Sequence, residues 1–239
     1  MRLRESLSRI PLFEGLTEAE IGRLDSQCAW RRYDEAERIL NFNDPGHEVF
    51  FVVQGRVRVS IQLKDDKDTI LVDLADGDVF GELSAIDKLP RSAGIDALSA
   101  CNIAKMPAAV FLDVIHRHPA VCDRVLQLLA QRVRATGARV AEFRSLNVQH
   151  RLFMELLRLA KLRPSEPNVA AISPPPYHQE IADRISARRE AVSREIKALE
   201  RAGIVDRRKG ALVICDVDAL KRSVGLEQYP IRSNQSGSI

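Results

Sequence analysis

The hydrophobic pattern of the chain is of two kinds, and each predicts a different secondary structure. Between about residues 29 and 106, apolar residues form short runs of the β type. Residues 49–53 are continuously apolar, whereas residues 56–63 (RVRVSIQL) alternate polar and apolar positions strictly, so that one face of this strand is apolar. Glycines and the polar segment 64–69 (KDDKDT) separate the runs at intervals typical of hairpins. The pattern predicts a small antiparallel barrel or roll.

A long helix is predicted to follow, from about Pro119 to residue 146. Its apolar or small positions are spaced alternately by four and three residues: Cys122, Leu126, Leu129, Val133, Thr136, Val140 and Phe143. A seven-residue repeat of this length is typical of a helix that packs along a partner helix. The alternative is burial against the β region of the same chain, because Val121, Val125 and Leu128 widen the stripe.

Shorter helices are predicted elsewhere in the chain. In residues 16–24 (LTEAEIGRL), Glu20 follows Thr17 by three positions, which is the spacing of a capping box. Residues 151–162 are amphipathic, and several prolines follow within residues 164–176. Because proline interrupts helices, we expect this proline-containing segment to be a loop inside a C-terminal domain.

Two further helices form a helix-turn-helix pattern near the C-terminus. Residues 178–185 and 190–202 have helical periods, and a four-residue break separates them. The apolar stripe of the second helix consists of Val192, Ile196 and Leu199. Gly203 ends this helix, and residues 204–215 (IVDRRKGALVIC) are typical of a β-hairpin with a basic turn.

The polar side chains of this pattern suit DNA. Arginine binds guanine through two donors, glutamate accepts from cytosine N4, and serine or lysine contacts bases or the backbone, while a basic hairpin suits phosphates. The alternative is that an outer helix face is simply solvated; helix, turn, helix and basic hairpin in this order favour DNA. The predicted DNA-binding residues are Arg188, Arg189, Glu190, Ser193, Arg194, Lys197, Arg207, Arg208 and Lys209.

Charge is distributed unevenly along the chain. The 239 residues have a net charge of +3. Residues 1–150 hold 20 basic and 22 acidic side chains, whereas the remaining residues hold 16 basic and 11 acidic ones. The surface that attracts anions is therefore expected in the C-terminal part.

Composition excludes several other classes of protein. The four cysteines, at positions 28, 101, 122 and 215, form no Cys-x-x-Cys pair, which argues against a zinc site or a disulfide framework. No apolar stretch approaches about 18 residues, and Arg2, Arg4 and Glu5 stand where a signal peptide would be apolar. We expect a cytoplasmic protein with no membrane contact.

A ligand pocket is predicted in residues 77–97. Gly81, Glu82, Leu83 and Ser84 have the pattern of a turn that enters a short helix, where free backbone N–H groups bind an anion, and Arg91 and Ser92 follow a second turn. Arginine binds a phosphate with a planar pair of donors, serine adds a hydroxyl, and Glu82 can accept from a sugar hydroxyl. The alternative is a structural turn braced by an Arg–Glu salt bridge.

These motifs together resemble the cyclic-AMP receptor protein/FNR family of bacterial transcription regulators over about residues 12–220. Residues 81–93 resemble the family's phosphate-binding cassette, residues 119–146 its dimerisation helix, and residues 178–202 its helix-turn-helix. The resemblance implies that Glu82 holds a ribose 2′-hydroxyl and that Arg91 and Ser92 hold a cyclic phosphate.

The resemblance also implies that Thr136 contacts the base across the dimer interface. The family has a second hydroxyl at the position of Gly137, and the span from Glu82 to Arg91 is one residue shorter here. These departures weaken the case for adenine more than the case for phosphate, so cyclic AMP and cyclic GMP are both candidate effectors. No iron–sulfur or haem pattern is present, and the five scattered histidines are expected to have ordinary surface or hydrogen-bonding roles.

The sequence thus predicts an α+β protein with an N-terminal antiparallel β-roll of the cyclic-nucleotide-binding type, a long central dimerisation helix and a C-terminal winged helix-turn-helix. The predicted boundaries are 1–118, 119–146 and 147–226, with a disordered tail at 227–239. We expect a homodimer that binds a palindromic operator in double-stranded DNA, responds to a cyclic nucleotide and contacts RNA polymerase.

Three alternatives remain open from the sequence. In the first, the pocket is vestigial and the regulator acts without a nucleotide or with another effector. In the second, the β-roll is an enzyme, but no nucleophile motif or metal constellation supports this, and neither catalytic residues nor a metal is predicted. In the third, the chain is a cyclic-nucleotide module that does not bind DNA, which conflicts with the basic winged end.

Overall fold

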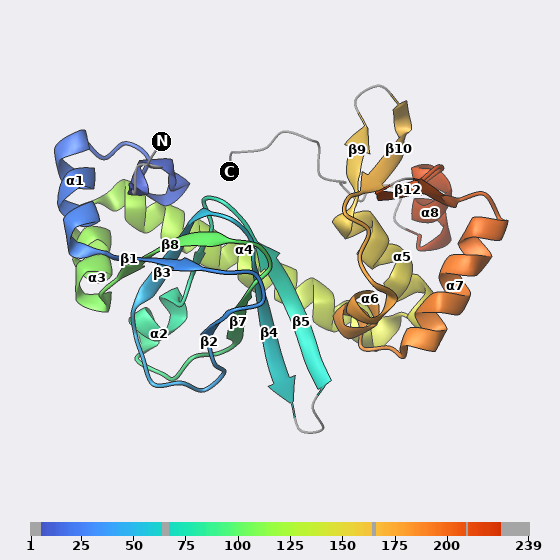
Figure 1. Ribbon diagram of the computed structural model, residues 1–239, viewed down its shortest axis with the longest axis horizontal. Helices are drawn as coiled ribbons and strands as arrows, with labels where there is room; N and C mark the ends of the chain where they lie inside the picture. The colour runs from blue at the N-terminus through green and yellow to red at the C-terminus, as the bar shows by residue number, and fades with distance from the viewer. Residues whose placement is uncertain (1–5, 64–66, 164–165, 209, 226–239) are drawn as a thin grey trace. The chain divides into compact units, whose positions relative to one another are not determined.

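The computed structural model describes residues 6–63, 67–163, 166–208 and 210–225, and it contains two compact units, residues 1–134 and 135–239 (Figure 1). This division falls inside the long helix, so the domain boundaries predicted from the sequence stay predictions. The predicted tail at 227–239 lies outside the described residues. Within the described part, no helix is both long enough and apolar enough to cross a membrane.

The first unit begins with short helices that pack against a β-roll. Two 3₁₀ turns, η1 (Leu7–Arg9) and η2 (Pro11–Phe13), precede helix α1 (Glu18–Gln27). The predicted capping box is confirmed: Thr17 Oγ1 accepts a hydrogen bond from the Glu20 N–H at 3.3 Å, and the Thr17 N–H donates to Glu20 Oε2 at 2.7 Å.

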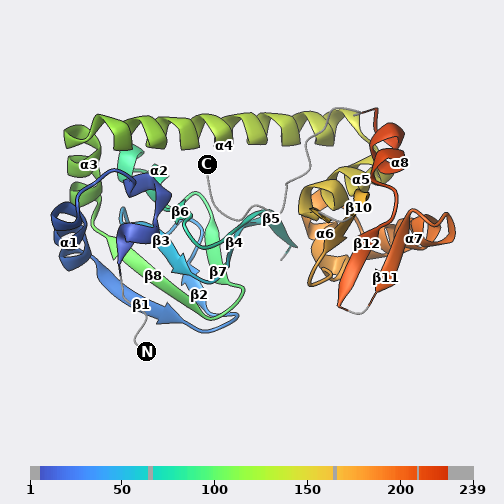
Figure 2. The same cartoon turned by 90° about the horizontal axis from the view of Figure 1, so that it is seen from above.

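Eight strands form two four-stranded antiparallel sheets, as the hydrophobic runs predict. One sheet has the order β1-β8-β3-β6 and the other β2-β7-β4-β5 (Figure 2). The strands are β1 (Ala29–Tyr33), β2 (Arg38–Leu40), β3 (Val49–Gln54), β4 (Val57–Leu63), β5 (Lys67–Leu74), β6 (Val79–Phe80), β7 (Gly94–Ala97) and β8 (Cys101–Met106).

Strand β3 is buried on both faces, which explains its unbroken apolar sequence. Phe50 and Val52 face the cluster between the two sheets, whereas Val49, Phe51 and Val53 face a second cluster formed with the N-terminal turns, α1 and α3 (Ala108–Arg117). A strand covered on both sides needs apolar residues at every position, not only at alternate ones. The sheet is therefore the middle layer of the first unit.

The start of the long helix α4 (Pro119–Ser145) is buried against its own chain, which is one of the two alternatives that the sequence left open; packing along a partner helix stays a prediction. Near its start, Val121 and Val125 are buried in the same cluster as α1 and α3. Further along, Leu126, Val133 and Val140, which are spaced by seven residues, are 59, 72 and 52% exposed. The start of α4 therefore packs on its own chain, and Leu129 of the predicted heptad stripe is partly buried there, whereas Leu126, Val133 and Val140 are exposed.

The second unit contains the last turns of α4 and a helical domain with a small sheet. Its elements are α5 (Val148–Leu159), β9 (Lys161–Arg163), β10 (Glu166–Ile172), α6 (His178–Ile185), α7 (Arg189–Arg201), β11 (Val205–Arg208), β12 (Ala211–Ile214) and α8 (Val217–Ser223). The expectation of a plain loop around the prolines was wrong, because residues 170–172 pair with β12 and the sheet has the order β11-β12-β10-β9. The predicted pair of helices and the following hairpin are confirmed.

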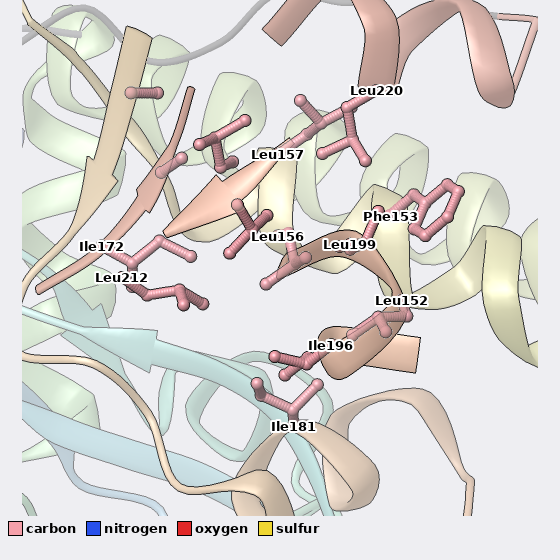
Figure 3. Close-up of a cluster of buried hydrophobic side chains, with 14 of the residues drawn as sticks. Leu152, Phe153, Leu156, Leu157, Ile172, Ile181, Ile196, Leu199, Leu212 and Leu220 are labelled. Carbon is pink, nitrogen blue, oxygen red and sulfur yellow. The ribbon is translucent and has the colours of Figure 1, made fainter. Parts of the chain in front are cut away.

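The core of the second unit joins α5 to the helix-turn-helix and the sheet (Figure 3). Leu152 and Leu156 of α5 are fully buried, as are Ile181 of α6 and Ile196 of α7. The predicted inward stripe of α7 is confirmed, since Val192 and Leu199 belong to the same cluster. This apolar core fixes α7 so that its opposite face points to solvent.

A buried carboxylate links three helices of this unit. Glu155 on α5 is 1% exposed and accepts hydrogen bonds from Arg139 Nη1 on α4, at 2.6 Å, and from Arg158. Arg184 on α6 is also buried, with its Nη1 3.7 Å from Glu155 Oε1. Arg139 Nη2 donates to the Arg184 carbonyl at 2.7 Å. The end of α4 is thereby tied to α5 and α6.

Glu155→Ala is expected to lower the free energy of unfolding of the second unit by about 1–3 kcal/mol, because buried arginine donors lose a hydrogen-bonded carboxylate while Glu142 and Glu180 still provide part of the countercharge. Urea-induced unfolding of the full chain measures this. The control is Glu166→Ala, which removes a partly exposed carboxylate whose Oε1 lies 3.3 Å from Arg163 Nη1. This substitution is expected to change the free energy of unfolding by no more than about 0.5 kcal/mol. Equal, small effects of the two variants would contradict the assignment.

Candidate ligand pocket and nucleic-acid interface

The predicted cassette forms where β6 turns into the short helix α2 (Glu82–Asp87). Gly81 occupies the turn with φ +79°, a left-handed conformation that favours glycine. A Cβ atom at this position would lie 2.7 Å from Arg91 Nη1 and 2.9 Å from the Glu48 carbonyl oxygen. Gly81 therefore serves two purposes, since it makes the turn and leaves space for the Arg91 side chain.

The Arg91 side chain is buried and held by three acceptors. Its Nη1 donates to the carbonyls of Glu48 and Gly81, at 2.9 and 3.2 Å, and its Nη2 donates to Glu48 Oε2 at 3.0 Å. The residue is only 3% exposed, and this burial lowers the pKa of Arg91, against the opposing effect of the Glu48 carboxylate. Arginine stays protonated nonetheless. The site thus contains a fixed cation.

Glu48 connects Arg91 to a second cation that the sequence analysis did not identify. Lys105 Nζ lies 2.6 Å from Glu48 Oε1, and the hydrogen bond from Lys105 is the main cause of the lowered pKa of Glu48. Lys105 is brought here by strand pairing, opposite Phe50 in the β3–β8 ladder. No local motif marks Glu48 or Lys105, so only the tertiary structure reveals them.

A cavity of about 490 Å³ opens beside Arg91 on the side of Glu48. Tyr33, Phe50 and Lys105 contribute to its lining, together with other residues of β1, β2, β8 and the loop before β3. Glu82 and Ser92 do not line it. The cavity is therefore adjacent to the cassette and does not coincide with it.

Glu82, the first residue of α2, is 1% exposed and pairs with a residue of α4. Its Oε1 accepts a hydrogen bond from Arg132 Nη1, and Arg132 Nη2 donates to the Val79 carbonyl at 2.6 Å. Arg132 was missed in the sequence analysis. A signal existed, because Arg132 precedes Thr136 by four residues and so shares its face of a helix.

The other predicted ligand residues have different surroundings. Ser84 is buried and its Oγ donates to the Pro90 carbonyl at 3.4 Å, which braces the cassette, whereas Leu83 and Ser92 are exposed. Thr136 is exposed and belongs to the second unit. The structure thus brings Gly81, Glu82 and Arg91 together, and the role of Thr136 stays a prediction.

The predicted DNA-binding residues of α7 lie on its solvent face. Arg188 occupies the N-cap position, without a capping hydrogen bond from its side chain. The other exposed residues of this face are Arg189, Glu190, Arg194 and Lys197. Within the described ranges, none of these five side chains has a hydrogen bond or ion pair. Long charged side chains without intramolecular partners are available to base edges and phosphates.

Two of the predicted wing residues, Arg207 and Arg208, form hydrogen bonds within the domain. Arg207 Nε donates to Glu200 Oε1 at 2.9 Å, and Arg208 Nε donates to Asp206 Oδ2 at 3.1 Å. Ser193 is half-buried, with its Oγ 2.7 Å from His178 Nδ1. Lys209 lies outside the described residues.

Comparisons with known proteins agree with both parts of the chain. Residues 30–118 match the cyclic nucleotide-binding domain, and residues 150–223 match the Crp-like helix-turn-helix domain. The CRP-like cAMP-activated global transcriptional regulator of Mycobacterium tuberculosis is 24% identical over 219 residues, which are 91% of this chain and 98% of that protein.

Two solved structures have a similar fold. A mutant of CooA from Carboxydothermus hydrogenoformans superposes with a TM-score of 0.73 at 22% identity, covering 85% of this chain and 90% of that one. The c-di-GMP responsive global regulator CLP of Xanthomonas campestris gives a TM-score of 0.68 at 21% identity, covering 83% and 99%.

The antiparallel roll with its cassette, the long helix and the winged helix-turn-helix agree with these matches in order and extent. The expectation from the sequence is therefore confirmed at the level of the family. This chain belongs to the cyclic-AMP receptor protein/FNR family of transcription regulators, with a cyclic nucleotide-binding domain followed by a Crp-like helix-turn-helix domain.

Proposed function

We propose that this protein is a homodimeric, sequence-specific DNA-binding regulator whose DNA affinity is controlled by a cyclic nucleotide, cyclic AMP or cyclic GMP. The observation that carries the proposal is the buried Arg91 guanidinium, fixed over Gly81 in the cassette turn and close to Glu82. A fixed cation beside a carboxylate suits a ligand that has both a phosphate and a hydroxyl.

Each cassette residue has a defined part in this proposal. Arg91 and Ser92 bind the cyclic phosphate together with backbone N–H groups of the cassette. Glu82 accepts a hydrogen bond from the ribose 2′-hydroxyl, and Arg132, which donates to Glu82, holds that carboxylate in place. The cAMP-activated regulator of Mycobacterium tuberculosis supports cyclic AMP as the effector.

The open stripe of α4 supports a dimer. Leu126, Val133 and Val140 are exposed at heptad spacing, and a second copy of the helix would bury them as knobs in a coiled coil. Thr136 follows Val133 by three residues and so belongs to the same predicted stripe, whose spacing alternates between four and three. In the dimer, Thr136 contacts the base of the nucleotide.

In the DNA complex, α7 of each subunit enters the major groove. Arg189, Glu190 and Arg194 contact base edges, and Arg208 contacts the backbone. Two-fold symmetry requires a palindromic operator with half-sites about 34 Å apart. The nucleotide controls DNA binding only if it binds the DNA-competent arrangement of the dimer more tightly than the inactive one. Equal affinity for both arrangements would not shift the equilibrium between them.

A second candidate function is a regulator that needs no nucleotide. It is favoured by one observation: Arg91 and Glu82 each already have a charged partner inside the chain, Glu48 and Arg132. In that case the cassette is a braced structural turn, and another effector or none controls the protein.

Titration of the purified protein with cyclic AMP and cyclic GMP by calorimetry separates these two functions. Arg91→Lys keeps the charge but loses the planar pair of donors, so nucleotide affinity is expected to fall by about 10- to 100-fold, which corresponds to a charged hydrogen bond of about 1.5–3 kcal/mol. The control Arg117→Lys changes an exposed residue of α3 and should leave affinity unchanged. No heat with either nucleotide in the wild type would favour the second candidate.

Arg194→Ala tests the DNA interface. With DNA selected from a random library by the wild-type protein, fluorescence anisotropy is expected to show a loss of affinity of about 5- to 150-fold, because a guanidinium contact to a base edge contributes about 1–3 kcal/mol.

The matched control is Arg222→Ala, which removes the same charge from the exposed surface of α8. Similar affinities of the Arg194 variant and the wild type for the selected DNA would refute the assignment of α7 as the recognition helix.

A further inference from the structure

His178, the first residue of α6, connects the recognition helix with the wing. Its Nδ1 lies 2.7 Å from Ser193 Oγ on α7, and its Nε2 is hydrogen-bonded to Arg207 Nη2 on β11. Arg207 Nε also donates to Glu200 Oε1, at 2.9 Å, near the end of α7. These side chains form one continuous hydrogen-bond network from the second turn of α7 to the wing.

The chemistry of the partners fixes the position of the imidazole proton. A guanidinium group has only donors, so His178 Nε2 accepts the hydrogen bond from Arg207. A neutral imidazole carries its single proton on the other nitrogen, so His178 Nδ1 is the donor to Ser193 Oγ. His178 is thus the Nδ1–H tautomer.

The surroundings of His178 keep it neutral. Burial lowers the pKa of His178, and the positive charges of Arg207 on β11 and of Arg189 and Lys197 on α7 act in the same direction, against the opposing charge of Glu200. A protonated imidazole has two donors and no acceptor, and could not receive the hydrogen bond from Arg207. The neutral form therefore predominates at pH 7.

This network determines what Ser193 offers to DNA. A free serine hydroxyl both donates and accepts, and so does not distinguish a base acceptor from a base donor. Ser193 Oγ accepts from His178, and its own O–H donates to no other group among the residues that the structure describes. The hydroxyl hydrogen remains for a partner outside the protein.

We propose that His178 is a specificity-determining positioning residue: it holds Ser193 as a hydrogen-bond donor, so that the base read by Ser193 must present an acceptor. Guanine, with O6 and N7, and thymine, with O4, meet this condition in the major groove, whereas cytosine presents the N4 donor. The inference rests on the proposed function, because it takes α7 as the helix that reads bases.

The tautomer is tested first, without DNA. Nitrogen-15 NMR of the histidine side chains in the full-length protein at pH 7.5 is expected to show His178 protonated at Nδ1 and unprotonated at Nε2. In Arg207→Ala the donor to Nε2 is lost, so the Nε2–H tautomer is expected to gain population. An Nε2–H tautomer or an imidazolium in the wild type would overturn the proposal.

The base preference is then measured on single-base variants of the selected operator. The position read by Ser193 is the one whose discrimination is lost in Ser193→Ala. There the wild type is expected to prefer guanine or thymine over cytosine by about 2- to 10-fold, the effect of one neutral hydrogen bond. A preference for cytosine, or a uniform loss of affinity for all variants, would overturn the specificity role.

Two substitutions of His178 give opposite expectations. His178→Gln retains an acceptor for Arg207 and a donor for Ser193, and should keep the wild-type preference. His178→Glu places acceptors on both partners, so the Ser193 hydroxyl donates to the carboxylate and offers only its lone pairs to DNA; the preference is then expected to reverse towards cytosine. An unchanged profile in His178→Glu contradicts the proposal.

The controls separate this inference from the proposed function. Thermal unfolding shows that each variant is folded. The added negative charge of His178→Glu lowers the affinity for every operator alike, so the ratio of affinities between operators that differ at one base does not depend on it. If the wild-type protein selects no DNA sequence, the proposed function fails. If it selects an operator that depends on Arg194 but not on the chemistry at His178, only the present inference fails.

Discussion

Arg91 is a buried cation, and its desolvation is tolerable only because three acceptors converge on its guanidinium group. This requirement organises the surrounding roll. Gly81 must lack a side chain to let the guanidinium approach, Glu48 must supply the countercharge, and Lys105 in turn stabilises Glu48. The position of the Arg91 guanidinium is thus set by contacts within the fold itself.

The same requirement recurs along α4, where two arginines seven residues apart bind buried carboxylates. Arg132 donates to Glu82 inside the first unit, and Arg139 donates to Glu155 inside the second. Arg132 thus ties α4 to the cassette turn inside the first unit, and Arg139 ties it to α5 and α6 inside the second, whereas Leu126, Val133 and Val140 remain exposed.

In the DNA-binding domain the polar network has a different purpose. Val192, Ile196 and Leu199 fix the orientation of α7 through the apolar core, and this leaves its polar face exposed (Figure 3). A hydrogen-bond network of His178, Arg207 and Glu200 then constrains one side chain of that face, Ser193. The neighbouring arginines need no such constraint, because a guanidinium group can only donate. Apolar packing sets the orientation of α7, and the hydrogen bond to His178 constrains the Ser193 hydroxyl on its polar face.

The element types could be predicted from the sequence, because periodicity and capping are local: the roll, the long helix, the capping box at Thr17 and the helix-turn-helix follow from residue spacing. Gly81, Glu82 and Arg91 could also be singled out, because they lie within one short motif. Their partners, in contrast, could be found only in the folded chain. Glu48, Lys105 and Arg132 lie 14 to 43 residues from Arg91 in the chain and reach the site through strand pairing and helix packing. Strand β10 was missed for the same reason, because β12, with which it pairs, is about 40 residues away.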